Sequence, residues 1–191
     1  TGLGLKYFLM LEDDCTDFMY RFPEGNKLGY APCRRLDDLF DAMIDFLNVS
    51  GALAIAFAQG GDFIGGVNSQ NFYRGLLRKC MNSFFCDVEK PIEFRGTMNE
   101  NVTTYTTLGS RGYLFFTVTK ANIVQKQSQS VSGGMTDVYK DSGTYQKSFY
   151  SIMSMPSCIK LAMMGDKHYR IHHNIDWNCC VPKILNQRWK K

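Results

Sequence analysis

The chain has 191 residues, a formal net charge of +4, and a composition that is 45% hydrophobic and 14% aromatic. This apolar content excludes an intrinsically disordered protein, and the length suits one domain with a substantial core. No run of about 18 apolar residues occurs, so no transmembrane helix is expected, and the first residues lack the features of a signal peptide. The seven cysteines are odd in number and include no C-x-x-C pair, so we expect free thiols in a cytoplasmic protein.

The first third of the chain predicts a strand, a helix and a second strand. Residues 7–11 form a continuous apolar run, which is typical of a strand buried on both faces of a parallel sheet. A turn-rich loop from Pro23 to Pro32 is expected next. Apolar residues then recur at helical spacing from Arg34 to Val49, with Gly51 ending the helix, and 52–58 form a second apolar run. This order indicates a βαβ unit with a right-handed crossover.

Further elements follow a glycine-rich loop, 59–66, that does not match a P-loop. Asn99 is a plausible N-cap of a helix, with Glu100 in its first turn. A polar, glycine-bearing loop is expected over 128–143. The expected elements are strands at 81–88, 113–119 and 158–164, helices at 99–111 and 144–155, and an extended segment at 168–173.

Three adjacent carboxylates, Glu12, Asp13 and Asp14, follow the first apolar run directly. Ligands of open α/β sheets bind at the carboxyl ends of strands, and clustered carboxylates are hard oxygen ligands for Mg²⁺ or Mn²⁺. In such a site one carboxylate binds the metal while another accepts a hydrogen bond from a ribose hydroxyl. A solvated acidic turn is the alternative interpretation.

Two further clusters carry possible chemistry. All three histidines fall between His168 and His173, where imidazoles could bind Mn²⁺ or Zn²⁺ or simply lie at the surface. Glu100 at a helix start could act as a general base, or only complement the helix dipole. Arg95 could meet a phosphate. No nucleophile motif and no dinucleotide-binding motif is present.

These features together resemble the TET/JBP-associated glycosyltransferases, a family of phage-type enzymes thought to glycosylate hydroxymethylated pyrimidines in DNA. The resemblance rests on KYFLMLEDD, FRGTMNENVTTYTTLGSRG and GDKHYRIHHNIDW, and covers the chain from Lys6 to Trp177. It implies an α/β fold, a single GT-A-like domain over 1–191 with a mixed, mostly parallel central sheet. The βαβ segment with which a GT-A fold begins is not seen before Thr1, so we expect either an N-terminally truncated fragment or a missing half that is provided differently.

The resemblance also implies roles for individual residues. Glu100 and Asp13 are the expected catalytic residues, and Glu12 and Arg95 are expected to contact the donor nucleotide. The expected metal ligands are Asp14, His172 and His173. The implied cofactors are Mn²⁺ or Mg²⁺ and a nucleotide-sugar donor, a UDP-sugar, and the implied location is the host cytoplasm.

DNA is the expected acceptor, with no membrane partner. The segment from Lys160 to Lys191 has seven basic and two acidic residues, which suits a polyanion or an ordinary solvated tail. Tyr139 and Tyr145 could stack on an extruded base, whereas the spacing of Phe149 favours a core position.

Two other classes of function stay open. One is a metal-dependent nuclease or nucleotidyltransferase, for which Asp62, Asp137 and Asp141 are weak candidates for a second acidic pair. The other is a non-catalytic nucleic-acid-binding module.

Overall fold

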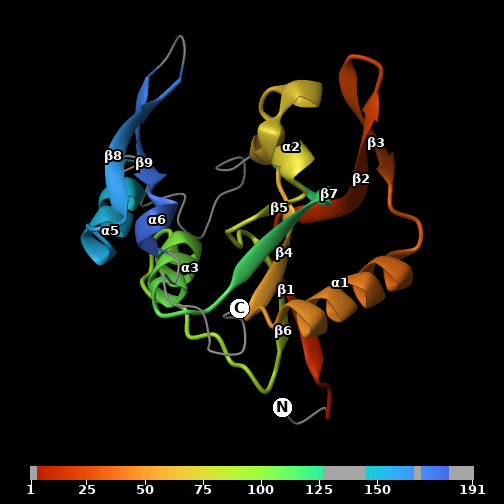
Figure 1. The fold of residues 1–191 in the computed structure, drawn as a ribbon, viewed down its shortest axis with the longest axis horizontal. Coiled ribbons are helices and arrows are strands. Elements are labelled where there is room, and N and C mark those ends of the chain that lie inside the picture. The colour runs from red at the N-terminus through yellow and green to blue at the C-terminus, as the bar shows by residue number, and fades with distance from the viewer. Residues whose placement is uncertain (1–3, 127–144, 166–168, 181–191) are drawn as a thin grey trace, which may run out of the picture. The chain divides into compact units, whose positions relative to one another are not determined.

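The computed structural model describes residues 4–126, 145–165 and 169–180 (Figure 1). They belong to two compact units, which we describe separately. The sheet unit comprises the chain to residue 92 together with 114–126, and the hairpin unit comprises 93–113 with the described residues from 145 onward. Over the part of the chain that is described, no helix has the length and apolarity needed to cross a membrane.

The sheet unit combines one long helix with a curled mixed sheet. Its strands are β1 (Tyr7–Leu11), β2 (Cys15–Glu24), β3 (Lys27–Pro32), β4 (Ala54–Ala58), β5 (Leu76–Leu77), β6 (Ser83–Asp87) and β7 (Phe115–Gln125). Its helices are α1 (Leu36–Ser50) and α2 (Gln70–Arg74), with 3₁₀ turns η1 (Gly60–Phe63) and η2 (Gly66–Asn68).

The strand order is β1-β6-β4-β7-β2-β3, with β5 also paired to β7. Only β4 and β7 pair in parallel among these strands, and every other pair is antiparallel. The expected mixed sheet is confirmed, but the prediction that it is mostly parallel is wrong. An apolar run reports burial and not direction: β6 is buried along its whole length, yet it runs antiparallel to both neighbours.

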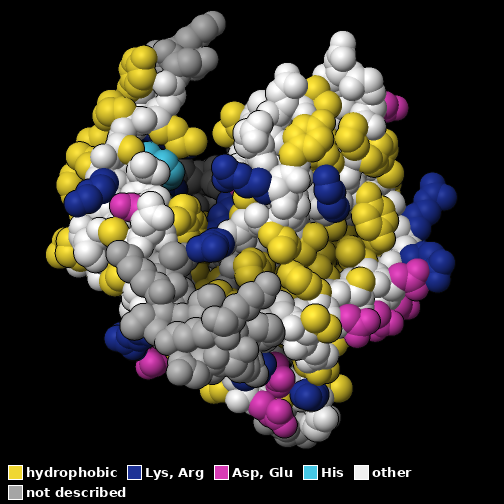
Figure 2. Space-filling view, in the orientation of Figure 1, with side chains coloured by type: hydrophobic (Ala, Val, Ile, Leu, Met, Phe, Trp, Pro, Cys, Tyr) yellow, Lys and Arg dark blue, Asp and Glu magenta, His cyan; other side chains and the backbone are white. Residues whose placement is uncertain are grey.

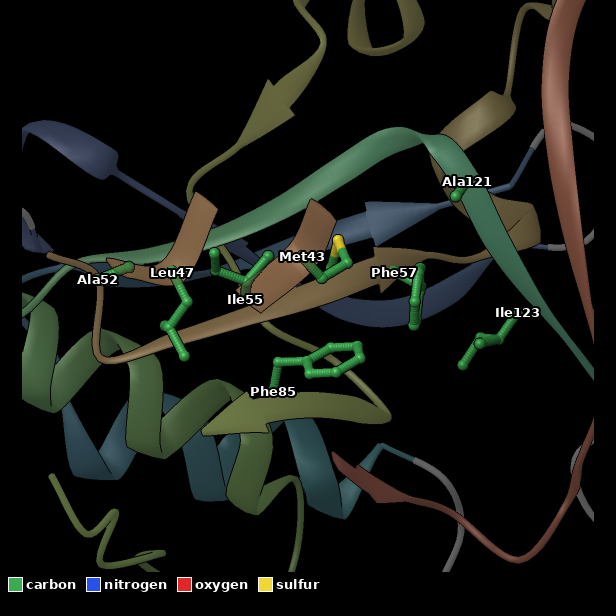
Figure 3. Packing of buried hydrophobic residues seen from close by; sticks show 8 residues of the cluster. All are labelled: Met43, Leu47, Ala52, Ile55, Phe57, Phe85, Ala121 and Ile123. Atoms are coloured by element: carbon green, nitrogen blue, oxygen red, sulfur yellow. The ribbon is translucent and has the colours of Figure 1, made fainter. Parts of the chain in front are cut away.

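The core of the sheet unit forms where α1 covers one face of the sheet. Figure 3 shows Met43 and Leu47 of α1 beside Ile55 and Phe57 of β4, and all four are at most 3% exposed. The expected helix and its glycine stop are confirmed, since Gly51 has the left-handed φ of 66° that a residue with a side chain rarely adopts. Helical spacing predicted this helix because it places one apolar stripe against the sheet.

The first apolar run is a strand, but it is not buried on both faces. β1 is an edge strand paired only with β6, and Phe8 and Met10 remain 41% and 37% exposed. β1 and β4 do run in the same direction, with β6 between them, so the strands of the predicted βαβ unit are not neighbours.

The loop expected from Pro23 to Pro32 is instead a β-hairpin. Glu24 pairs with Lys27, which leaves Gly25 and Asn26 as the turn between β2 and β3. The sequence carried this signal, because aromatic residues alternate along β2 before a Gly-Asn dipeptide.

The hairpin unit packs three helices with a two-stranded sheet. Its elements are α3 (Glu100–Ser110), α5 (Gln146–Ser154), β8 (Ile159–Met164), β9 (Arg170–Ile175) and α6 (Trp177–Cys180). The predicted helices and strands of this region are confirmed within a few residues. Tyr105 of α3 stacks on Trp177 of α6, with ring centroids 5.7 Å apart. Phe149 is 41% exposed, so the core position expected for it is wrong.

Candidate functional site

The carboxyl ends of β1, β4 and β7 define one edge of the sheet unit. The three strands run in the same direction, and they end at Leu11, Ala58 and Gln125. Ligands of open α/β sheets bind beyond such ends, where loops are free to vary while the strands hold them in place. The acidic turn and the glycine-rich loop both begin at this edge.

The acidic turn, Glu12–Asp14, is held by hydrogen bonds to residues at the end of β7 and just before β6. Asp14 Oδ1 accepts a hydrogen bond from Gln125 Nε2 at 2.8 Å, and Gln125 Oε1 accepts one from Asn82 Nδ2 at 3.1 Å. The Lys126 amide also donates to the Asp14 carbonyl at 3.0 Å, and the Glu12 amide to the Asn82 carbonyl at 3.3 Å. Glu12 and Asp13 are exposed and Asp14 is half-buried, so a ligand can reach these carboxylates on a backbone that is already held in position.

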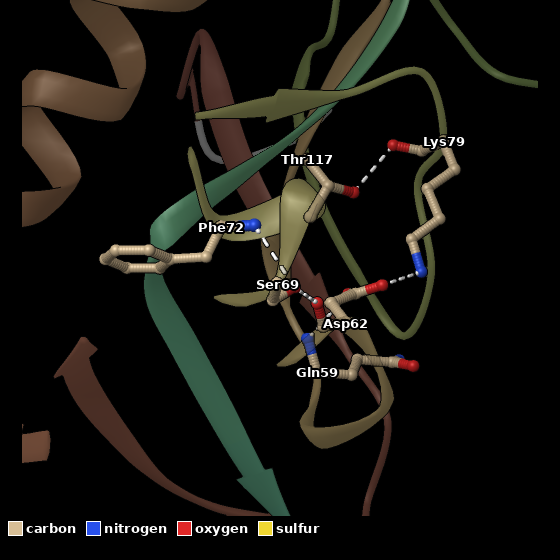
Figure 4. Close-up of polar contacts among 6 residues, drawn as sticks. All are labelled: Gln59, Asp62, Ser69, Phe72, Lys79 and Thr117. Carbon is tan, nitrogen blue, oxygen red and sulfur yellow. Dashed lines mark hydrogen bonds and ion pairs between the residues drawn. The ribbon is translucent and has the colours of Figure 1, made fainter. Parts of the chain in front are cut away.

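The glycine-rich loop continues β4 into η1 (Figure 4). Asp62 closes this turn: its Oδ2 accepts from the Gln59 amide at 3.0 Å, and its Oδ1 forms an ion pair with Lys79. Asp62 is 4% exposed and both its oxygens have protein partners, which indicates a structural role instead of the second acidic pair of a nuclease. Gln59 Nε2 is buried with no hydrogen-bond partner among the described residues, so a ligand oxygen could accept from it.

Arg95 and Glu100 lie around the start of α3 in the hairpin unit. Asn99 precedes the helix with a φ of 54°, and its side chain does not cap the helix as expected; Nδ2 donates instead to Ser151 Oγ at 2.6 Å. The Arg95 amide donates to Thr104 Oγ1 at 3.0 Å, which ties the preceding loop to the helix. The Arg95 Nε atom is buried without a hydrogen-bond partner in the described structure, while Nη2 lies 3.8 Å from Glu93 Oε2 in an exposed ion pair. Glu100 is half-buried in the first turn.

His172 and His173 lie side by side on β9, with ring centroids 4.4 Å apart. Burial, and then the charges of Arg170 and Lys147, lower the pKa of His172. Burial, His172 and Lys147 lower the pKa of His173 to about 4. Both rings are therefore neutral at pH 7, and His173 Nδ1 is buried without a partner among the described residues.

The donor chemistry fits a divalent cation at the acidic turn better than at the histidines. Mg²⁺ is commonly held by one or two carboxylates together with substrate phosphates, and the exposed carboxylates of Glu12–Asp14 match that pattern. The charged side chains that act on the two histidines, Arg170 and Lys147, are both cationic. Across the described ranges, no group of three or more His, Cys, Asp or Glu side chains is arranged to hold a metal ion. Metal binding by Asp14, His172 and His173 stays a prediction; Asp14 belongs to the sheet unit and the two histidines to the hairpin unit.

Several expected residues lie outside the described residues: His168, Tyr139, Asp137, Asp141, the loop 128–143, and the end of the basic segment from residue 181. Tyr145 is described and is 48% exposed. The sequence reading missed Gln59, Asn82 and Gln125. Gln59 follows the predicted strand 52–58, which was the available signal. Gln125 ends a strand that extends past the predicted bound of 119, and only the fold brings Gln125 to Asp14 and Asn82 to Gln125.

Comparison with protein-family models identifies a family for this chain. The family model described as TET-Associated Glycosyltransferase matches residues 1–134. This range contains the acidic turn, the glycine-rich loop, Arg95 and Glu100, and it stops before the two histidines of β9. No curated protein and no solved structure matches the chain.

Proposed function

Because the chain belongs to the TET-associated glycosyltransferases, we propose that it transfers a sugar from a nucleotide-sugar donor to the hydroxymethyl group of a modified pyrimidine in DNA. The observation that carries this proposal is the acidic turn, which is held at the carboxyl edge of the sheet inside the region that matches the family. An apolar strand that ends in such a turn also supports a GT-A-like fold.

The donor is a nucleotide sugar, with UDP as the proposed carrier, at the edge formed by β1 and β4. Glu12 accepts a hydrogen bond from a ribose hydroxyl, and Gln59 Nε2 offers its unused donor to an oxygen of the same ligand. Asp13 and Asp14 would hold Mn²⁺ or Mg²⁺ together with the diphosphate. When bound there, the cation would neutralise the charge that develops on the leaving nucleoside diphosphate.

In the proposed transfer, the hydroxymethyl oxygen of the acceptor attacks the anomeric carbon of the sugar. The bond from that carbon to the diphosphate oxygen breaks, and its electron pair leaves with the nucleoside diphosphate. The family resemblance supplies the remaining roles: Glu100 is the proposed base for the proton of the hydroxyl and Arg95 the proposed phosphate contact, and both belong to the hairpin unit. A hydroxymethyl group inside a duplex is hidden in the groove, so the acceptor base must be extruded or unpaired.

The test is a transfer assay in which release of nucleoside diphosphate is measured with the full chain, a panel of UDP-sugars and Mn²⁺. The proposal expects release that depends on DNA containing hydroxymethylcytosine or hydroxymethyluracil, and that is lost when EDTA is added. Release that is equal with unmodified DNA would overturn the assignment of the acceptor, and no release with any donor would overturn the proposed reaction.

A further inference from the structure

Arg21 is held between two aromatic rings in the sheet unit. Its guanidinium carbon lies 5.2 Å from the ring centroid of Tyr30 on β3 and 4.8 Å from that of Phe63 on η1. Its Nε donates to Asn122 Oδ1 at 2.8 Å, and Asn122 is only 2% exposed. A guanidinium has five N–H donors in a planar fork, so most of its donors remain for another acceptor. The neighbours of Arg21 therefore fix its position and leave most of its N–H donors available for a ligand.

Lys120 of β7 makes a second contact of the same kind. Its Nζ lies 3.3 Å from the ring centroid of Phe72 and donates to the Phe72 carbonyl at 3.3 Å. The next residue, Tyr73, packs edge-on against Phe72 and is 58% exposed. Tyr30 is 64% exposed. Two cations and two exposed rings are therefore presented by neighbouring elements, and we call this set (Arg21, Tyr30, Phe63, Phe72, Tyr73 and Lys120) the aromatic–basic face.

Among the described residues, no carboxylate neutralises the positive charge of this face. Neither Arg21 nor Lys120 forms an ion pair with any described carboxylate. Phe18 of β2 packs on Phe40 of α1, and side chains alternate along a strand, so Arg21 lies on the face of the sheet opposite α1. The aspartates of α1 consequently lie on the other side. In Figure 2, dark-blue side chains lie next to yellow ones over the middle of the sheet unit, and magenta ones gather along α1 with further dark-blue ones beside them.

We infer that the aromatic–basic face binds the unpaired strand of the DNA acceptor, with Arg21 and Lys120 on phosphates and Tyr30 and Tyr73 stacking on bases. Cations interleaved with exposed aromatic rings are the features by which proteins hold single-stranded nucleic acid. The rings come from β3, η1 and α2, which offers more stacking surface than one mononucleotide needs. The inference rests on the proposed function, because that function requires an extruded or unpaired acceptor base.

The experiment measures fluorescence anisotropy of a labelled single-stranded oligothymidylate with the full chain and no donor. Tyr30→Leu and Tyr73→Leu should each weaken binding by about tenfold, since each removes one stacking surface. Arg21→Gln should also lower the slope of log K against log salt by about 0.7, the value for one phosphate contact to a single strand. Arg21→Lys should restore the salt slope but not the full affinity, because an ammonium keeps the charge without the planar stack.

Matched controls come from the other face of the same unit. Tyr20→Leu changes a tyrosine of β2 that pairs with Ala31 and so points away from Tyr30. Arg35→Gln removes an exposed arginine that pairs with Asp38 on α1. Both controls should bind the oligonucleotide as the parent does. Thermal unfolding followed by circular dichroism verifies that every variant is folded before its affinity is compared.

Unchanged affinity in Arg21→Gln and both tyrosine variants would overturn the inference, as would equal losses in the controls. Competition by UDP for the same site, with loss of UDP affinity in the variants, would assign the face to the donor and also overturn it. Because no donor is present in the binding assay, failure of sugar transfer does not affect its outcome. Transfer that proceeds normally in variants with unchanged DNA binding would leave the proposed function standing and remove only this face from it.

Discussion

Single residues of the acidic turn give the sharpest test of the donor site. Asp14 is held by Gln125 at the carboxyl edge, whereas Asp17 is exposed on β2. Asp14→Ala should abolish Mn²⁺-dependent binding of UDP-glucose measured by calorimetry, because it removes a carboxylate ligand and no core volume. Asp17→Ala is the matched control and should bind normally. Unchanged affinity in Asp14→Ala would remove this residue from the site.

A substitution at Glu100 distinguishes a catalytic role of this residue from a contribution to the helix dipole. Glu100→Gln keeps the size and hydrogen bonding of the side chain but cannot accept a proton, so turnover should fall by at least about 100-fold while donor affinity changes little. Glu89→Gln is the control, since Glu89 is exposed and forms no ion pair with a described residue. If turnover in Glu100→Gln is close to that of the control, Glu100 is not the base and only complements the helix dipole in the first turn.

His173 should make the hairpin unit sensitive to acid. Its pKa is lowered from 6.5 to about 4 in the folded chain, so the unfolded chain binds the proton more readily as pH falls. This residue therefore costs stability progressively between about pH 6.5 and pH 4, and contributes no such loss above that window. His173→Phe cannot titrate, so its melting temperature should fall less than that of the parent across this window in circular dichroism scans. If the melting temperatures of His173→Phe and of the parent fall equally across this window, the lowered pKa of His173 is contradicted.

At the scale of elements, what the sequence predicted depended on how local each signal was. The stripe that contains Met43 and Leu47, and the stop at Gly51, lie within one helix, and the helix was found. The hairpin at Gly25–Asn26 has a local signal too, but Pro23 and Pro32 favour a loop prediction, which is wrong. The pairing of β6 between β1 and β4 and the contact of Asp14 with Gln125, 111 residues apart, depend on distant segments and left no local signal.

The packing of α3 against α6 depends on one glycine. A Cβ at Gly109 would lie 2.7 Å from the Cys180 carbonyl oxygen, and that oxygen belongs to backbone that cannot move alone. Gly109→Ala should therefore destabilise the chain by about 1–3 kcal/mol, the usual cost of an overpacked contact. Gly61→Ala is the control, because a Cβ there meets nothing within 4 Å. Denaturant titration compares the unfolding midpoints of Gly109→Ala and Gly61→Ala. Equal midpoints would show that α6 can shift without a loss in the free energy of unfolding.

At the scale of the whole molecule, the family match and the site fall on the same part of the chain. The match ends at residue 134, so it includes the acidic turn and the start of α3 but not β9. The resemblance of three segments, KYFLMLEDD, FRGTMNENVTTYTTLGSRG and GDKHYRIHHNIDW, predicted this family, and the family model confirms it. These segments did not reveal the mixed pairing of the sheet or the aromatic–basic face, because both arise from contacts between strands that are far apart in the sequence.

The most direct measurement of the central claim is the mass of the acceptor itself. A single-stranded oligonucleotide with one hydroxymethylcytosine is incubated with the chain, Mn²⁺ and UDP-sugars, and its intact mass is recorded by mass spectrometry. The account predicts that the strand gains one sugar residue, that the same strand with unmodified cytosine does not, and that Asp14→Ala gives no product. A strand that is cleaved would instead indicate a nuclease, and a strand unchanged with every donor, in this form and with hydroxymethyluracil, would contradict the account.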